Sequence, residues 1–438
     1  MLSFIAAILV GSLLLWLPVS AADGVSVSYI DALFTATTAT CVTGLVTLTT
    51  ATAWSGFGQA VILILIQLGG LGIITVMAGI AAAVNRRLAL SDRVLLQDAF
   101  NLNSLSGLSE FVKKVIKGTF LVEAAGALAY MTVFVPRFGL RGVWISVFTS
   151  VSAFCNAGID VFAEDSLCGF ATNPVINLVT MLLIVLGGLG YVVWWDLLRV
   201  MQDKKIRWRH KFSRLTFHSK IALSATAVFI FGGAAVIFAF ECGNPLTTGG
   251  MTLWEKLLVS LFQSVTTRTA GFMTVPQTDI SNGTALVSLI LMFIGGSPVG
   301  TAGGIKTVTM VVLIASSVAA IKNKKDVTLF GRTVPAGAAS RALGIVGMMF
   351  ATVFVSTLAL TAVCDADMLD ILFECVSAAA TVGLSRNLTP TLDIYGRLII
   401  IATMYLGRVG PISLAIAFNF KKQRQDIVKN PEENISVG

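Results

Sequence analysis

The sequence is poor in charged residues and in the side chains that most often do catalytic chemistry. Only 12% of its 438 residues are Asp, Glu, Lys or Arg, whereas about 25% is usual in soluble globular proteins. Its six cysteines are too few for a disulfide scaffold, and its two histidines are too few for a histidine-based metal cluster. Hydrophobic residues make up 55% of the chain. This composition excludes a string of soluble domains and indicates an integral membrane protein.

Long apolar stretches with few charges are what the sequence has in abundance. A helix needs roughly 20 residues to cross the hydrocarbon core of a bilayer. The eight stretches of about this length are 2–20, 59–84, 118–135, 175–195, 221–240, 284–305, 342–363 and 394–420. The first stretch lacks the basic start and the clear cleavage site of a signal peptide, so we expect it to be a helix as well. The sequence predicts an all-α integral membrane protein with eight transmembrane spans.

The basic residues gather on one side of the predicted membrane. Alternating spans place four segments on that side: 85–117, 199–220, 322–341 and 421–438. These segments hold 23 of the 31 Lys and Arg, while the opposite segments hold five Lys and Arg and thirteen Asp and Glu. By the positive-inside rule we expect a multi-pass protein of the cell membrane with both termini in the cytoplasm. The basic surplus then sets the topology beside membrane lipid, and nucleic acid is not an expected partner.

Each of the four outer segments contains a short, moderately apolar stretch that ends in a glycine. These glycines recur at intervals of 112 to 114 residues, at Gly44, Gly158, Gly271 and Gly383. Glycines in the span that follows recur with a similar period, at Gly69, Gly187, Gly295 and Gly407. The shared period predicts four tandem repeats, each a helix, a re-entrant pore helix with its loop, and a second helix. The expected repeats cover 1–85, 110–198, 219–321 and 341–420, and a cytoplasmic tail covers 421–438.

Four such loops around one axis would form a ring of backbone carbonyls. Small-residue packing between membrane helices would explain one loop, but four loops in register at membrane depth need water or an ion to satisfy their polar groups. Glycine lets a backbone aim its carbonyl oxygens inward, and the C-terminal end of each pore helix adds about half a negative charge. We therefore expect a potassium-channel-like filter. Its carbonyls are those of Val42, Thr43, Asn156, Ala157, Thr269, Ala270, Thr381 and Val382, and its glycines are Gly44, Gly158, Gly271 and Gly383.

The loop motifs carry a resemblance to a known family. The chain closely resembles the Trk/Ktr/HKT superfamily of potassium transporters in Thr-Cys-Val-Thr-Gly-Leu (40–45), Cys-Asn-Ala-Gly (155–158), Thr-Arg-Thr-Ala-Gly-Phe (267–272), Ala-Thr-Val-Gly-Leu (380–384) and Gly-Gly-Ser-Pro-Val-Gly-Thr-Ala-Gly-Gly (295–304). With eight spans it is similar to the Ktr membrane subunit rather than the longer Trk form. The resemblance implies a homodimer, with one pore per subunit, on a ring of cytoplasmic nucleotide-binding regulatory subunits.

The resemblance also bears on the ion. Gly44 fits the potassium branch of the family, because the sodium-selective branch has serine at that position. Potassium is therefore the expected substrate, bound at the filter only, and no cofactor is expected in this chain. Coupling of transport to sodium stays open.

Segment 295–304 interrupts the sixth predicted span. Its five glycines and Pro298 cannot hold a continuous helix, so we expect a loop halfway through the bilayer. Lys306 and Arg408 lie at a similar depth, where a cation costs at least about 2.5 to 3.5 kcal/mol unless it reaches carbonyls or water. The resemblance implies that this loop blocks the pore below the filter and that Arg408 contacts it. The expected gate residues are Gly300, Gly303, Gly304, Lys306 and Arg408.

Two other ionisable residues need an explanation. Arg268 lies inside a filter motif, and a cation lining the path would repel the substrate. We therefore expect it behind the filter, paired with Glu374, Glu255 or Asp370. Glu123 is expected to form a hydrogen bond at a helix interface, with a role in ion coupling as the alternative. The outer cysteines that could form a disulfide are Cys168, Cys242 and Cys364.

Other functions account for less of this pattern. A sodium-selective or non-selective cation transporter would use a similar ring of carbonyls. A membrane enzyme would need acidic pairs, histidines or a cofactor motif at membrane depth, and the sequence contains none that we recognise. An assembly subunit would not require four glycine loops in register. The expected activity is potassium uptake, and enzymatic activity is not expected.

Overall fold

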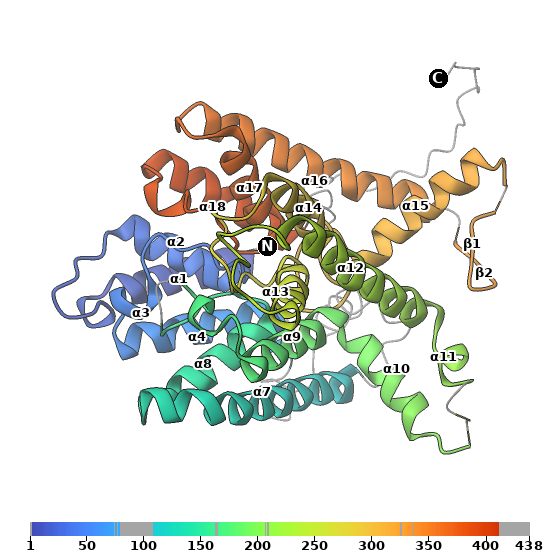
Figure 1. Cartoon of the computed structure of the whole chain (residues 1–438), viewed down its shortest axis with the longest axis horizontal. Helices are drawn as coiled ribbons and strands as arrows, with labels where there is room; N and C mark the ends of the chain where they lie inside the picture. Colours follow the sequence, from blue (N-terminus) through green and yellow to red (C-terminus); the bar gives the residue numbers. More distant parts are fainter. Residues whose placement is uncertain are drawn as a thin grey trace.

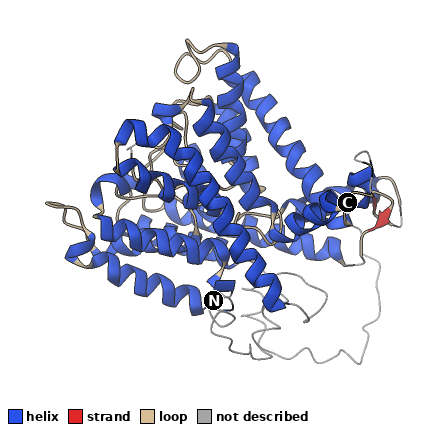
Figure 2. Ribbon diagram, turned by 90° about the horizontal axis from the view of Figure 1, so that it is seen from below, coloured by secondary structure: helices blue, strands red, loops and turns tan. Residues whose placement is uncertain are grey.

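The structure is a computed structural model that describes residues 2–73, 75, 76, 78, 108–162, 165–205, 207, 210–324, 326–335 and 337–410. Within these residues the chain is mostly helical, and its strands form one two-stranded ribbon in which Thr328 pairs with Thr333 (Figure 2). The tail 421–438 and much of segment 85–117 lie outside the described residues, as do the far ends of the predicted spans 59–84 and 394–420. The predicted helical fold is confirmed for the described part.

The helices fall into four groups that follow one another around the molecule, from blue through green and yellow to red in Figure 1. The first group contains α1 (Leu2–Trp16), α2 (Tyr29–Cys41), α3 (Thr50–Ala53) and α4 (Gly56–Leu71). The second contains α7 (Leu108–Phe138), α8 (Arg141–Cys155), α9 (Pro174–Leu189), α10 (Tyr191–Gln202) and α11 (Lys211–Arg214). The third contains α12 (Phe217–Glu241), α13 (Leu253–Thr266), α14 (Asn282–Phe293), α15 (Thr307–Ile321), β1 (Thr328–Leu329) and β2 (Arg332–Thr333). The fourth contains α16 (Ala338–Thr361), α17 (Met368–Ala380) and α18 (Ile394–Val409).

The four groups close into a ring through one short helix each. These short helices are α2, α8, α13 and α17, of 13 to 15 residues. Each packs against a helix of the preceding group: α8 on α4, α13 on α9, α17 on α14 and α2 on α18. Each also carries a fully buried phenylalanine, namely Phe34, Phe148, Phe262 and Phe373. The recurring phenylalanine of the sequence therefore anchors each short helix in the core.

Two arginines join neighbouring groups near the N-terminal ends of these helices. Arg397 on α18 pairs with Asp31 on α2 at 2.6 Å, which connects the fourth group to the first. Arg386 pairs with Asp370 of its own group, on α17, at 2.5 Å and donates to the carbonyl of Gln277, which connects the fourth group to the third. Because these side chains are largely shielded from solvent, removal of one partner of either ion pair would leave the other charge without compensation and is expected to destabilise the fold more than the loss of a surface pair would.

Helix breaks shorten most of the predicted spans. Among the described residues, three helices are long and apolar enough to cross a membrane: Glu110–Phe138, Phe217–Glu241 and Ala338–Thr361. The bent pair α9 and α10, at 100°, makes a fourth if it is counted as one span. Three helices of the ring, α4, α9 and α18, end at glycines with φ between +81° and +85°, namely Gly72, Gly190 and Gly410. The eight-span topology therefore stays a prediction.

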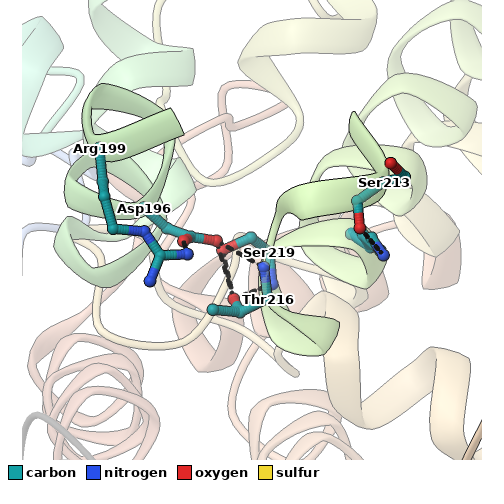
Figure 3. Close-up of polar contacts among 6 residues, drawn as sticks. Asp196, Arg199, Ser213, Thr216 and Ser219 are labelled. Carbon is teal, nitrogen blue, oxygen red and sulfur yellow. Dashed lines mark hydrogen bonds and ion pairs between the residues drawn. The ribbon is translucent and has the colours of Figure 1, made fainter. Parts of the chain in front are cut away.

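Beyond the bend between α9 and α10, polar contacts hold α10 against α12. Asp196 accepts hydrogen bonds from the backbone N–H of Thr216 at 2.8 Å and from its hydroxyl at 2.9 Å (Figure 3). Arg199 pairs with the same carboxylate at 2.5 Å, and the Thr216 hydroxyl also contacts Ser219. Since Thr216 caps α12, these contacts fix α10 to the first turn of that helix.

Candidate functional site

The loops after the four short helices contain a similar left-handed turn, which follows the helix directly in the first, second and fourth loops and comes two residues later in the third. One residue in each loop has left-handed φ, between +52° and +66°: Val42, Asn156, Thr269 and Thr381. The next residue turns its N–H back onto its own helix, at 2.8 to 2.9 Å: Thr43 to the carbonyl of Thr38, Ala157 to Ser152, Ala270 to Thr266 and Val382 to Ser377. The backbone N–H groups of these four residues are thus used by the helix, which leaves the loop carbonyls for contacts on the other side.

The four glycines that follow meet one another in a closed ring. A Cβ placed on Gly44 would lie 2.5 Å from the carbonyl oxygen of Ala157 in the second loop. The same relation, at 2.5 to 2.6 Å, connects Gly158 to Ala270 and Gly271 to Val382. Gly383 completes the ring, because a Cβ placed on it would lie closer still to the carbonyl oxygen of Thr43. Only glycine fits at such a distance, so each loop glycine is required by the carbonyl of the next loop.

The structure therefore brings all twelve predicted filter residues together. The eight residues whose carbonyls were expected to bind the ion are at most 1% exposed. The ring is formed by main-chain groups of residues far apart in sequence, and its order follows the order of the four groups.

The filter glycines line a cavity of about 380 Å³. All four of them contribute to its wall. Among its described lining residues there are two carboxylates, Asp160 and Asp165, and no lysine or arginine. A cavity with this lining attracts cations and raises their local concentration next to the ring.

The glycine-rich segment 295–304 lies against the break between α9 and α10. From the segment, the N–H of Ser297 donates to the carbonyl of Gly188 at 2.8 Å, and the N–H of Thr301 donates to the carbonyl of Gly187 at 3.1 Å. In the other direction, the N–H of Tyr191 donates to the carbonyl of Val299 in the segment at 3.1 Å. A Cβ on Gly190 would collide with the carbonyl of Pro298. The predicted interruption of the sixth span is confirmed, since α14 ends at Phe293 and α15 begins at Thr307.

Both predicted gate cations contact carbonyls around this segment. Arg408 donates to the carbonyl of Thr301 at 2.7 Å and to that of Gly69 at 2.5 Å. Lys306 donates to the carbonyl of Ala302 at 2.6 Å. Arg408 therefore joins the end of α18 to the segment and to α4, and these carbonyls accept from several of the donors of its half-buried guanidinium. The expected contact between Arg408 and the segment is present, while its role as a gate stays a prediction.

The segment also lines a second cavity, of about 410 Å³. Its wall includes all five predicted gate residues, Gly300, Gly303, Gly304, Lys306 and Arg408. There is no room for a side chain at Gly303, because a Cβ there would collide with the hydroxyl of Thr381 in the fourth filter loop. Gly303 thus touches the ring and the second cavity at once.

The prediction that Arg268 pairs with a carboxylate is wrong. In the described part of the chain its buried guanidinium contacts the carbonyl of Gly295 at 3.4 Å and the hydroxyl of Thr226 at 3.5 Å. The three carboxylates considered have other partners: Glu374 accepts from Ser385 and Thr389, Glu255 caps α13 with Thr252, and Asp370 pairs with Arg386. The physical reason is that the end of α14 leaves the Gly295 carbonyl without a helical partner, and a guanidinium can use it.

Glu123 and the outer cysteines were the remaining residues with predicted contacts. Glu123 is buried on α7 and accepts hydrogen bonds from the side-chain amide of Gln67 at 3.1 and 3.2 Å, so the predicted interface hydrogen bond is confirmed. All six cysteines are free thiols, and the disulfide left open for the outer cysteines is not formed.

A second periodic feature was not among the predictions. Three residues after the periodic glycines Gly69, Gly187 and Gly407, the helices α4, α9 and α18 end at Gly72, Gly190 and Gly410. The corresponding residue of the third repeat is Pro298, inside the segment that separates α14 from α15. In this register Arg408 occupies the position held by glycine in the other three repeats. The periodic tetrapeptides Gly69–Gly72 and Gly187–Gly190, which are identical, are the signal that could have revealed it.

Comparisons with known proteins agree with this arrangement. Residues 2–429 match the TrkH family, described as a cation transport protein. The potassium/sodium uptake protein NtpJ of Enterococcus hirae is 39% identical, over 99% of this chain and 95% of its own length. The Ktr system potassium uptake protein B of Bacillus subtilis is 36% identical, over 100% and 95%.

The fold is also found in a solved structure. The crystal structure of the potassium transporter TrkH from Vibrio parahaemolyticus superposes with a TM-score of 0.76 over 95% of this chain and 85% of that chain, at 17% identity. This likeness shows a shared fold. The family match over nearly the whole chain shows that the protein belongs to the TrkH family of cation transport proteins and is a transporter, not an enzyme.

Proposed function

We propose that this chain is the ion-translocating membrane subunit of a potassium uptake system. The observation that carries the proposal is the closed ring in which each loop glycine lies against a carbonyl of the next loop. Carbonyls held at such a ring replace the hydration shell of a potassium ion. The names of the two relatives, potassium/sodium uptake protein and Ktr system potassium uptake protein B, support the same substrate.

The path of the ion follows from the charges beside the ring. A cation enters the cavity lined by Asp160 and Asp165 and reaches the carbonyls of the four loops. The C-terminal ends of α2, α8 and α17 meet those loops directly, and each contributes about half a negative charge. The ion moves down its electrochemical gradient, which is worth about 2.3 kcal/mol per charge for each 100 mV.

The segment 295–304 acts as a gate in this proposal. It lies between the filter loops and the second cavity, and Arg408 holds it through the carbonyl of Thr301. Opening would require the segment to leave this position, with the loss of the Arg408 contact. Gly300, Gly303 and Gly304 give the backbone the freedom for such a movement.

The setting of the subunit is part of the proposal. Eight spans in four pore-helix repeats would place both termini in the cytoplasm of a cell-membrane protein. A homodimer on a ring of cytoplasmic nucleotide-binding subunits is the assembly that we infer, and the word system in the name of the second relative supports the need for further subunits. Transport of sodium, or coupling to it, is the second candidate, which the name of the first relative supports.

Uptake of rubidium, a potassium analogue, by potassium-depleted cells tests the proposal. Cells that express the chain should take up rubidium faster than cells that do not, and potassium should compete more strongly than sodium. Equal competition by the two ions would favour the sodium or non-selective alternative. Insertion into the membrane without any cation uptake, in the presence of the partner subunit, would contradict the proposed function.

A further inference from the structure

The gate segment and the filter share hydrogen bonds that neither role alone requires. The N–H of Gly303 donates to the hydroxyl of Thr269, in the third filter loop, at 3.1 Å. The hydroxyl of Thr301 lies 3.2 Å from the side-chain oxygen of Asn156, in the second filter loop, and 3.1 Å from the carbonyl of Phe154. Thr269 and Thr301 are completely buried. These contacts are therefore shielded from water, which could otherwise replace either partner.

A further contact spreads this link through the filter. The side-chain amide of Asn156 reaches the carbonyl of Arg268 at 3.5 Å, so the second and third loops are also connected to each other. The guanidinium of Arg268 reaches back to Gly295, the first residue of the gate segment. The second and third loops thus form one hydrogen-bonded unit with the segment.

The first and fourth loops are different. The hydroxyls of Thr43 and Thr381 are buried, and in the described part of the chain neither has a hydrogen-bond partner. Thr381 touches the segment only by packing on Gly303. The gate segment is therefore hydrogen-bonded to two of the four loops, and its displacement would release those two hydrogen-bonded loops, while the fourth loop would lose only a packing contact.

We propose that Thr269 and Thr301 are positioning residues that tie the third and second filter loops to the gate segment, so that displacement of the segment changes the ion preference of the filter together with its conductance. The inference rests on the proposed function. Ion preference in a carbonyl filter depends on the positions and field of all its carbonyls. When two adjacent loops are released, the carbonyls of the four loops no longer hold equivalent positions around the ion. The carbonyl ring then fits a potassium ion less closely.

The test removes each hydroxyl and keeps the shape of the side chain. Thr269→Val removes the acceptor of the Gly303 N–H, and Thr301→Val removes the hydroxyl that contacts Asn156 and Phe154. Thr269→Ser and Thr301→Ser keep a hydroxyl. Valine is compatible with the left-handed position of Thr269, because Val42 occupies the equivalent position in the first loop. Thr352→Val is the matched control, since its hydroxyl bonds only to the carbonyl of Met348 within α16.

The readout is rubidium uptake per inserted molecule and its inhibition by potassium and sodium. Both valine variants should lower the preference for potassium over sodium about two- to tenfold, the effect of one net hydrogen bond, and should raise uptake per molecule. Both serine variants should restore the preference, and Thr352→Val should match wild type. If Thr269→Val does not insert, Thr301→Val, which alters no filter residue, carries the test.

Three results would overturn the inference. The first is an unchanged preference in the valine variants. The second is a change in Thr269→Val without one in Thr301→Val, which would locate the effect in the filter alone. The third is a serine variant as impaired as its valine counterpart. A wild-type chain that transports no cation would instead contradict the proposed function, so the two failures are distinguishable.

Discussion

Replacement of Gly44 by serine perturbs the ring at a single point. The new Cβ would lie 2.5 Å from the carbonyl oxygen of Ala157 and 3.2 Å from the Cα of Gly383, so two neighbouring loops must move. The backbone at Gly44 also has φ of +104°, which costs a residue with a side chain about 1–3 kcal/mol. If this cost falls on the potassium-bound state, the preference for potassium over sodium drops about 5- to 150-fold.

Competition of potassium and sodium for rubidium uptake, per inserted molecule, measures this effect. Gly250→Ser is the matched control, because Gly250 also has positive φ, of +79°, but has open space where the Cβ would lie. It adds backbone strain without moving a carbonyl, and its ion preference should equal that of wild type. An unchanged preference in Gly44→Ser, or an equal loss in Gly250→Ser, would refute the assignment of Gly44 to the filter.

Three other predictions follow from the contacts described. Arg408→Ala removes both bonds to backbone carbonyls and should raise potassium flux per inserted molecule, whereas flux at or below wild type would mean that Arg408 only stabilises the fold. Asp31→Asn breaks the pair with Arg397 and should lower the free energy of unfolding in detergent by about 1–3 kcal/mol, measured by thermal unfolding; an unchanged stability would show that the pair contributes nothing. In a cysteine-free background, Leu246→Cys should react with an impermeant thiol reagent from outside intact cells and Phe330→Cys should not, and the reverse pattern would overturn the orientation.

The ring of loop glycines could be predicted from the sequence because its geometry restricts residue type. A carbonyl 2.5 Å from a potential Cβ leaves glycine as the residue that fits, so four such contacts leave four glycines at a regular period. The interruption at 295–304 was visible for the same reason, since glycine and proline mark where a helix cannot continue. In both cases the backbone geometry restricts which amino acids can occupy the position, so the requirement is visible in the sequence.

The partner of Arg268 could not be predicted in this way. Every residue has a backbone carbonyl, so the sequence does not distinguish the carbonyl of Gly295 from any other. An argument from residue types can propose only side-chain acceptors, and for a buried arginine a carboxylate is the first choice. The bonds between Thr301 and Asn156 and between Gly303 and Thr269 were missed because they join residues 34 and more positions apart whose side chains have many alternatives.

Helix lengths were overestimated for a related reason. Hydropathy counts a continuous apolar stretch as one span, whether or not its backbone bends inside it. Gly190 divides the apolar stretch 175–195 between two helices at 100° to each other, although by length and hydropathy the two helices together resemble one span. The packing of Gly190 against Pro298, which fixes the bend, involves residues of another group.

The direct test of the central claim is the position of a heavy potassium analogue in crystals of the protein. In crystals grown with rubidium or thallium, anomalous scattering should show an ion on the axis of the ring, among the carbonyls of Thr43, Ala157, Ala270 and Val382. Replacement by sodium should remove the peak without moving the four loops apart. Ordered loops with no ion among these carbonyls, and an ion bound elsewhere along the path, would contradict the account.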